Sequence, residues 1–178
     1  MAMARVKRAV WLDCDPGHDD AIAIILAAHS DNIDLLGIST VYGNEEVSKV
    51  TLNALKVLRT CGRDDIDVVA GQAKPLIRPR RACPEIHGET GLNGTSLPEP
   101  MKGPLRGKAV NVMYERISRR FQSPSEEGGN RRIALVCTAS LTNIALLITV
   151  YPEMQDMIEG IQTLILSVVF TLRDRRQR

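Results

Sequence analysis

Short apolar segments alternate with amphipathic helical segments along this chain, and this alternation most constrains how the chain can fold. Segments rich in β-branched and apolar residues predict buried strands at 9–12, 33–40, 67–71, 133–137 and 161–166. Helical spacing or helix start signals follow at 19–26, 47–58, 108–121, after Ser140 through Leu147, and from 152. Alternating strands and helices form βαβ units. We therefore predict an α/β fold with a doubly wound, mostly parallel sheet and helices on both faces.

The composition fits a soluble globular protein, with 44% hydrophobic and 25% charged residues. Aromatic residues make up only 3%, which argues against a stacking platform for single-stranded nucleic acid. The longest apolar runs, 144–150 and 161–170, are too short to span a membrane. The four cysteines lack metal-binding spacing, and no secretory signal precedes the first strand. We expect reduced thiols, a cytoplasmic location, and no nucleic-acid or membrane partner.

Two further regions differ from this alternating pattern. Residues 72–106 hold most of the nine prolines and predict a long loop region with little regular structure. The last six residues hold four Arg and one Asp, whereas the rest of the chain is close to neutral. We interpret this basic end as a solvated one, the alternative being contact with a membrane surface or nucleic acid.

The strongest functional signal is the run Asp13-Cys14-Asp15-Pro16-Gly17-His18-Asp19-Asp20, where a strand gives way to a helix. Asp13 and Asp15 share one face of the strand end because side chains alternate with a period of two. Asp19 and Asp20 fall in the first helical turn, where the helix dipole offsets only about 0.3–1 kcal/mol per charge. Crowded carboxylates share protons or hold a cation, and oxygen ligands favour Ca²⁺ or Mg²⁺. An acidic helix cap is the alternative; it fits two of these acids easily, but four around a Pro-Gly turn fit it poorly.

Polar residues also follow other predicted strands. In a doubly wound sheet, sites form at the carboxyl ends of the strands. The Asp-rich run, Tyr42-Gly43-Asn44 and Thr138 all occupy such positions. We expect these three groups to lie along one edge of the sheet.

The run Leu12–Ala21 closely resembles the N-terminal signature of the nucleoside hydrolases, the inosine–uridine-preferring group. Three further stretches agree with that family in order and spacing, and the similarity covers residues 8 to about 166. Residues 92–97 resemble the eukaryotic uridine/purine nucleosidases most closely. The supporting stretches are Gly37–Asn44, Ile86–Leu92 and Val136–Asn143.

The resemblance implies an enzyme that cleaves the N-glycosidic bond of ribonucleosides such as inosine and uridine, giving ribose and a free base. It implies a Ca²⁺ ion held by Asp15, Asp20 and the backbone carbonyl of Thr138. The metal would lower the pKa of a water, and Asp15 would take the proton of that water as catalytic base. The attack would pass through an oxocarbenium-like transition state.

Other roles also come only from the resemblance. Asp19 would bind a ribose hydroxyl with Asn44 beside it, and His87 would lie near the nucleobase. Asp13 would orient ligands or water from outside the direct ligand set. The family further implies purine and pyrimidine salvage through nucleoside catabolism, and a homo-oligomer. The base preference stays open.

The chain also departs from the family pattern. Family members are nearly twice as long, and no glycine turn follows the strand that ends at Leu166. We expect 8–166 to be the N-terminal part of a nucleoside hydrolase domain, incomplete at the C-terminus, and 167–178 to be a divergent basic tail. The absent residues would supply the last calcium ligand, so we expect weak or no hydrolysis and a tendency to aggregate.

Two alternatives remain beside a hydrolase. One is a non-catalytic truncated isoform that binds calcium weakly or pairs with full-length subunits. The other is a phosphatase of the haloacid-dehalogenase type, which also places Asp-x-Asp after its first strand. Pro16-Gly17 followed by Asp19-Asp20 fits that motif poorly, and no downstream lysine and acidic pair follows in the expected context.

Overall fold

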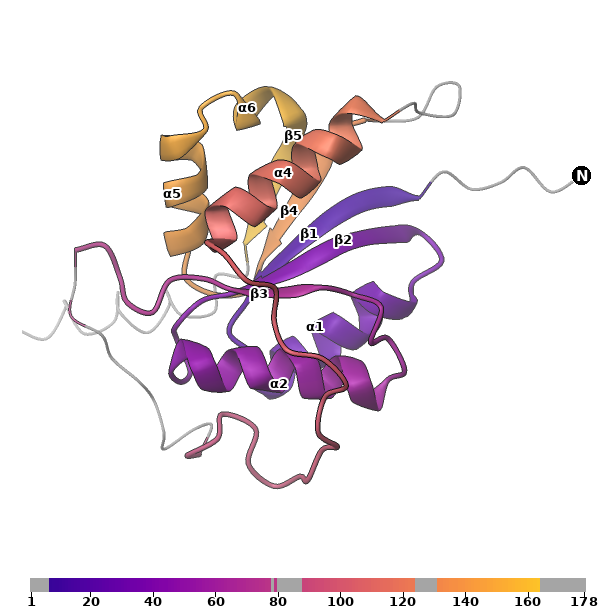
Figure 1. Ribbon diagram of the computed structural model, residues 1–178, viewed down its shortest axis with the longest axis vertical. Coiled ribbons are helices and arrows are strands. Elements are labelled where there is room, and N and C mark those ends of the chain that lie inside the picture. The colour runs from indigo at the N-terminus through magenta and orange to yellow at the C-terminus, as the bar shows by residue number, and fades with distance from the viewer. Residues whose placement is uncertain (1–6, 78, 80–87, 124–130, 164–178) are drawn as a thin grey trace, which may run out of the picture.

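The computed structural model describes residues 7–77, 79, 88–123 and 131–163, and its centre is a parallel five-stranded sheet (Figure 1). The strand order is β3-β2-β1-β4-β5. The chain moves outward from β1 to β3 and then returns to β4 on the other side of β1, which is the doubly wound arrangement predicted. The strands are β1 (Arg8–Cys14), β2 (Ile33–Thr40), β3 (Val68–Ala70), β4 (Ile133–Cys137) and β5 (Ile158–Thr163).

Helices cover both faces of this sheet (Figure 1). One face carries α1 (His18–His29) and α2 (Val47–Thr60). The other carries α4 (Ala109–Gln122), α5 (Thr142–Val150) and the short α6 (Met154–Met157). The α/β prediction is therefore confirmed in both its sheet and its layers.

The central strand β1 supplies both cores because its side chains alternate between the two faces. Trp11 is 2% exposed and packs in the cluster beneath α4 and α5. Leu12 and Cys14 pack with Ile24 in the cluster beneath α1 and α2. Strand β1 is buried from Ala9 onward, as a near-continuous apolar run predicts for the middle of a parallel sheet.

The last strand differs from its prediction. β5 begins at Ile158, three residues before the predicted start at 161, while residues 164–166 lie outside the described part of the chain. Glu159 and Gly160 interrupt the apolar pattern, but the backbone pairs with β4 all the same, from Ile158 opposite Ile133. Most of β5 is exposed, so burial did not require an apolar sequence there. The predicted tail 167–178 also lies outside the described residues.

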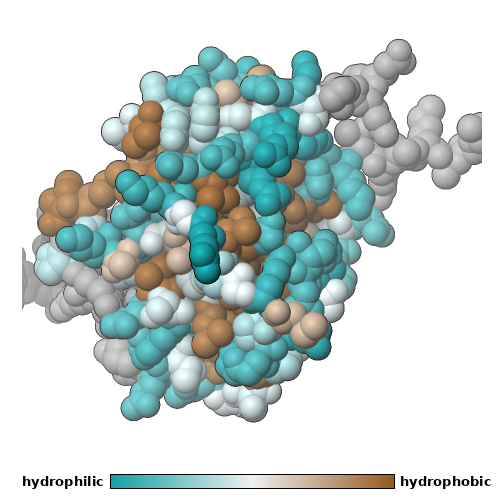
Figure 2. All heavy atoms as spheres, in the orientation of Figure 1, coloured by the Kyte–Doolittle hydropathy of each residue, from teal (hydrophilic) through white to brown (hydrophobic). Residues whose placement is uncertain are grey.

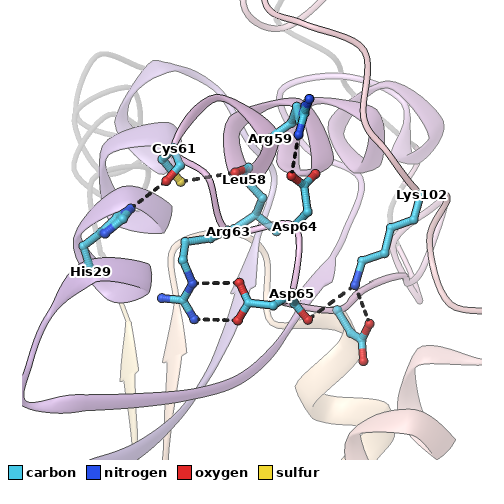
Figure 3. Close-up of polar contacts among 9 residues, drawn as sticks. His29, Leu58, Arg59, Cys61, Arg63, Asp64, Asp65 and Lys102 are labelled. Atoms are coloured by element: carbon cyan, nitrogen blue, oxygen red, sulfur yellow. Dashed lines mark hydrogen bonds and ion pairs between the residues drawn. The ribbon is translucent and has the colours of Figure 1, made fainter.

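The amino ends of the strands, called here the amino edge, carry acids paired with bases (Figure 3). Arg63 donates to both carboxylate oxygens of Asp65 at 2.8 Å. Asp67, just before β3, contacts Lys102 at 2.9 Å and Arg116 at 2.6 Å. The hydrogen bonds from Arg63 lower the pKa of Asp65. Burial opposes ionisation of Asp67, but Lys102 and Arg116 still hold the pKa of Asp67 below the ordinary value. Further pairs are Arg8–Glu159, Arg59–Asp64 and Arg120–Asp34.

The surface is mainly hydrophilic on the face that Figure 2 shows, with smaller hydrophobic areas between polar side chains. Exposed large hydrophobic residues include Ile22, Ile25 and Leu26 on α1. Within the described residues, no helix is both long and apolar enough to cross a membrane. Cys14, Cys61 and Cys137 are free thiols.

Candidate functional site

The carboxyl ends of β1, β2 and β4, called here the carboxyl edge, bring three polar segments together. The ladder pairs Asp13 with Ser39 of β2 and with Cys137 of β4. The next residue after β4, Thr138, donates its backbone N–H to the Asp13 carbonyl at 2.9 Å. The Asp-rich turn (residues 13–20), the 41–44 turn and Thr138 thus lie along one edge, as the parallel sheet predicted.

Asp13 is fully buried in a network of neutral groups. Its Oδ1 accepts hydrogen bonds from Ser39 Oγ and, at 2.8 Å, from Asn143 Nδ2. Trp11 Nε1 donates to Ser39 Oγ at 2.9 Å. Burial raises the pKa of Asp13 from 3.8 to about 7 against the effect of these donors. An acid held this way favours its neutral form unless positive charge is nearby.

Asp15 is held in one orientation by the 41–44 turn. Asn44 donates its backbone N–H to Asp15 Oδ2 at 2.7 Å and its side-chain amide to the Asp15 carbonyl at 2.9 Å. Gly43 is required by this close approach, because a Cβ there would lie 1.9 Å from Asp15 Oδ2. Burial, and after it the nearby charge of Asp20, raise the pKa of Asp15 from 3.8 to about 8.

Asp20 completes a pair of buried carboxylates with Asp15. It is 2% exposed in the first turn of α1, and burial raises its pKa above the ordinary value. In the described residues, no ion pair joins Asp13, Asp15 or Asp20 to a basic side chain. The carboxyl edge therefore concentrates acids without neutralising them.

The chemistry of this edge fits a hard cation. Asp13 Oδ2, Asp20 Oδ1 and Thr138 Oγ1 are buried and make no hydrogen bond of good geometry in the described part of the chain. Thr138 and Asp15 still lie close enough to Asp20 to lower its pKa in part, against the larger effect of burial. Unpartnered buried oxygens beside crowded carboxylates indicate an oxygen-ligated ion. Across those same residues, no three His, Cys, Asp or Glu side chains form a metal-binding cluster. Two carboxylates would thus need carbonyl or water oxygens beside them, which Ca²⁺ accepts readily.

The remaining predicted residues divide into two groups. Asp19 is exposed at the start of α1, where its charge contributes to the raised pKa values of Asp15 and Asp20. His87 lies outside the described residues, so its predicted contact with a nucleobase stays a prediction.

Two residues that support the carboxyl edge were not predicted from the sequence. Ser39 bridges Trp11 and Asp13, and its signal was a polar residue near the end of a buried strand. Asn53 is buried on α2 and donates to two backbone carbonyls, and its signal was a polar residue among apolar helix positions. Asn143 donates to the Thr40 carbonyl at 3.0 Å as well as to Asp13.

Two curated proteins are similar to this chain over most of its length. A probable ribonucleoside hydrolase from Dictyostelium discoideum is 44% identical over 155 residues, which are 84% of this chain and 45% of that protein. The pyrimidine-specific ribonucleoside hydrolase RihA of Shewanella woodyi is 46% identical over 156 residues, 88% of this chain and 47% of that protein. The chain spans about half the length of the curated relatives it matches.

Solved structures agree with the fold. A purine-preferring ribonucleoside hydrolase from Gardnerella vaginalis aligns with a TM-score of 0.78 at 25% identity, covering 88% of this chain and 48% of that one. A plant nucleoside hydrolase aligns with a TM-score of 0.74 at 27% identity, covering 88% and 47%. The sequence model described as inosine-uridine preferring nucleoside hydrolase matches residues 10–164. With the Asp-rich turn at the expected edge of the expected sheet, this chain belongs to the inosine–uridine preferring nucleoside hydrolase family.

Proposed function

We propose that the carboxyl edge binds a calcium ion and a ribonucleoside and serves hydrolysis of the N-glycosidic bond, giving ribose and a free base. One observation carries this proposal: Asp15 and Asp20 are buried next to each other, both with raised pKa values, in a setting of unpartnered oxygens. Such carboxylates are stable in the ionised form only beside positive charge. Family membership directs the choice of reaction.

Asp15, Asp20 and the backbone carbonyl of Thr138 would hold the calcium ion. When bound, the ion would supply the positive charge that makes a water easier to deprotonate. It would also favour the ionised forms of both carboxyls, which burial alone disfavours.

The chain's own groups would then position and deprotonate the attacking water. Asn44 occupies Asp15 Oδ2 with its backbone N–H, which leaves Oδ1 to take the proton. Asp13 supports this arrangement from within the sheet, because its backbone carbonyl accepts the N–H of Thr138. A base held by its backbone and side chain loses little conformational freedom when the reaction begins.

Substrate recognition would use the exposed rim of the same edge. Asp19 would accept a hydrogen bond from a ribose hydroxyl, with Asn44 beside it, and His87 would lie near the base. The named relatives include a pyrimidine-specific and a purine-preferring enzyme, so inosine and uridine are both suitable test substrates. A cytoplasmic location, nucleoside salvage and a homo-oligomer complete the proposal.

A second candidate follows from the coverage of the relatives, of which the chain spans about half. In this version residues 8–166 are the N-terminal part of the hydrolase domain, followed by a divergent tail at 167–178. The chain then binds calcium weakly, or pairs with full-length subunits, without turning over nucleosides.

Calorimetric titration of the purified chain with calcium tests the shared basis of both candidates. We expect one calcium site, and a loss of affinity in Asp20→Asn beyond the roughly 10–100-fold typical of residues that only support a metal ligand. Asp31→Asn, an exposed acid away from the edge, serves as the matched control and should bind calcium like the wild type.

Release of ribose from inosine and uridine separates the two candidates. Calcium binding with turnover that Asp15→Asn abolishes supports the hydrolase. Calcium binding without turnover supports the second candidate. Absence of calcium binding contradicts the hydrolase and leaves only the pairing form of the second candidate, which a pull-down with the full-length protein then supports or contradicts.

A further inference from the structure

We propose that Asn53 is a positioning residue that joins the Asp-rich turn to segment 88–94, so that the two move as one unit at the carboxyl edge. Asn53 lies in the second turn of α2 and is 6% exposed. Its Nδ2 donates to the Pro16 carbonyl at 3.2 Å and to the Thr90 carbonyl at 2.8 Å. One side-chain amide carries two hydrogens, and here it serves acceptors that are far apart in sequence.

The two acceptors dictate the residue type at position 53. Both are backbone carbonyls, so the group between them must be a donor on both sides. Aspartate would place a carboxylate against two carbonyl dipoles, and leucine would fill a similar volume without donating. Either change leaves two carbonyls without this donor, which is costly wherever water cannot replace it.

Segment 88–94 lies directly against the N-terminal turns of the helices that frame the site. Leu92 is buried in the core cluster of α1 and α2. Lys49 of α2 donates to the Glu89 carbonyl, and His18 at the start of α1 donates to the Asn93 carbonyl at 3.0 Å. The segment is thus attached to α1 through His18 and to α2 through Lys49 and Asn53.

Gly91 shows how closely the segment approaches Asn53. It has a φ of +79°, in the left-handed region that favours glycine, and it is buried. A Cβ at this position would lie 3.1 Å from Asn53 Nδ2. A side chain there would press directly on the amide that joins the two segments.

These contacts connect the carboxylates to segment 88–94. Pro16 follows Asp15 directly, so any ligand that fixes Asp15 also restricts the Pro16 carbonyl, and through Asn53 the Thr90 carbonyl. Occupation of the carboxylate pair should therefore order a segment that holds none of the proposed calcium ligands. This part rests on the proposed function, because it takes calcium at Asp15 and Asp20 as the ligand.

Hydrogen exchange measured by mass spectrometry on the full chain tests the inference. With EDTA present, Asn53→Leu should speed exchange in both 13–20 and 88–94 by about two- to ten-fold, the equivalent of one hydrogen bond. Exchange in α5 should not change. In the wild type, calcium should slow exchange in both segments; in Asn53→Leu it should slow exchange only in 13–20.

A second variant approaches the same contact from the other side. Gly91→Ala should uncouple the segments without altering α2, and it carries the test if Asn53→Leu fails to fold. Gly62→Ala is its matched control, with a φ of +71° and no atom within 4 Å of the added Cβ. The control shares the backbone penalty but should keep the calcium response in both segments.

The outcomes separate this inference from the proposed function. Wild-type protection by calcium in 13–20 but not in 88–94 overturns the inference, and so does an unchanged calcium response in Asn53→Leu. A chain that binds no calcium contradicts the proposed function instead. The EDTA arm then decides: faster exchange of both segments in Asn53→Leu supports the inference, and unchanged exchange in 88–94 overturns it.

Discussion

Asp67 at the amino edge contacts two cations, whereas Asp15 at the carboxyl edge contacts a backbone N–H and lies beside another carboxylate. The consequence is a lowered pKa for Asp67 and a raised one for Asp15. Both edges belong to the same sheet, and both carry acids. The difference teaches that the charge environment, rather than the number of acids, separates a structural edge from a candidate site.

The largest expected effect is an opposite pH dependence of the two edges in the metal-free chain. Folding raises the pKa of Asp13 to about 7 and that of Asp15 to about 8, both from 3.8. Their contribution to stability is complete below pH 3.8 and is lost as pH rises toward 8. Between pH 3.8 and the folded pKa, the free energy of unfolding should fall by about 1.4 kcal/mol per pH unit for each of these carboxyls, because the folded chain keeps a proton that the unfolded chain has lost.

Denaturant unfolding in EDTA at pH 5 and pH 8 measures this loss. Asp15→Asn should make the pH dependence shallower, because an amide cannot ionise. Asp65 and Asp67, with lowered pKa values, should lose their contribution only as pH falls below 3.8. Equal stability at pH 5 and pH 8 would contradict the raised pKa values of Asp13 and Asp15.

Displacing Asp15 without changing any charge should have the next largest effect. In Gly43→Ala the new Cβ would lie 1.9 Å from Asp15 Oδ2, so the carboxylate must move. We expect calcium affinity to fall about 10- to 100-fold, as for other changes that misplace a metal ligand. Gly103→Ala, where an added Cβ meets nothing within 4 Å, is the matched control in calorimetry. Wild-type affinity in Gly43→Ala would contradict the role of Asp15.

Removing an acid from the amino edge should affect stability and leave calcium binding unchanged. Asp67→Asn loses the ion pairs to Lys102 and Arg116, which are partly exposed, so we expect a loss of about 1 kcal/mol at pH 7. Thermal or denaturant unfolding measures this loss, with Asp31→Asn as the exposed control. A change in calcium affinity in Asp67→Asn would remove the distinction between the edges.

The smallest effect should come from the exposed pair of Arg63 and Asp65. The Asp65 side chain is 64% exposed, and pairs of this kind contribute about 0–1 kcal/mol. Asp65→Asn should therefore destabilise the chain by less than about 0.5 kcal/mol in denaturant unfolding. A loss as large as that of Asp67→Asn would show that these amino-edge pairs act as one network.

The sequence predicts the layered fold well because alternation is a global signal. Each apolar run from Ala9 to Cys137 became a strand, since a parallel sheet must bury both faces. The start of β5 was missed because Glu159 and Gly160 lack that apolar pattern, although Ile158 and Gly160 pair with Ile133 and Ala134 of β4. An exposed strand pairs through its backbone and needs no apolar pattern in its sequence.

The candidate site could be predicted in part. Asp13, Asp15 and Asp20 could be predicted as a site, because crowded carboxylates must share protons or hold a cation. Ser39 and Asn53 carry only a weak signal, because a single Ser or Asn in a buried element has many uses. Their roles depend on which backbone groups fall opposite them, and only the folded chain fixes that.

The hydrogen bond from Trp11 to Ser39 gives the candidate site an optical reporter. Trp11 is the only tryptophan of the chain, and Ser39 Oγ connects its indole to Asp13. Ultraviolet emission excited at the tryptophan band therefore comes from one fluorophore, two hydrogen bonds from a buried carboxyl. Titration of Asp13, or a cation placed beside it, can be followed in the unlabelled protein as a change in the intensity and colour of that emission.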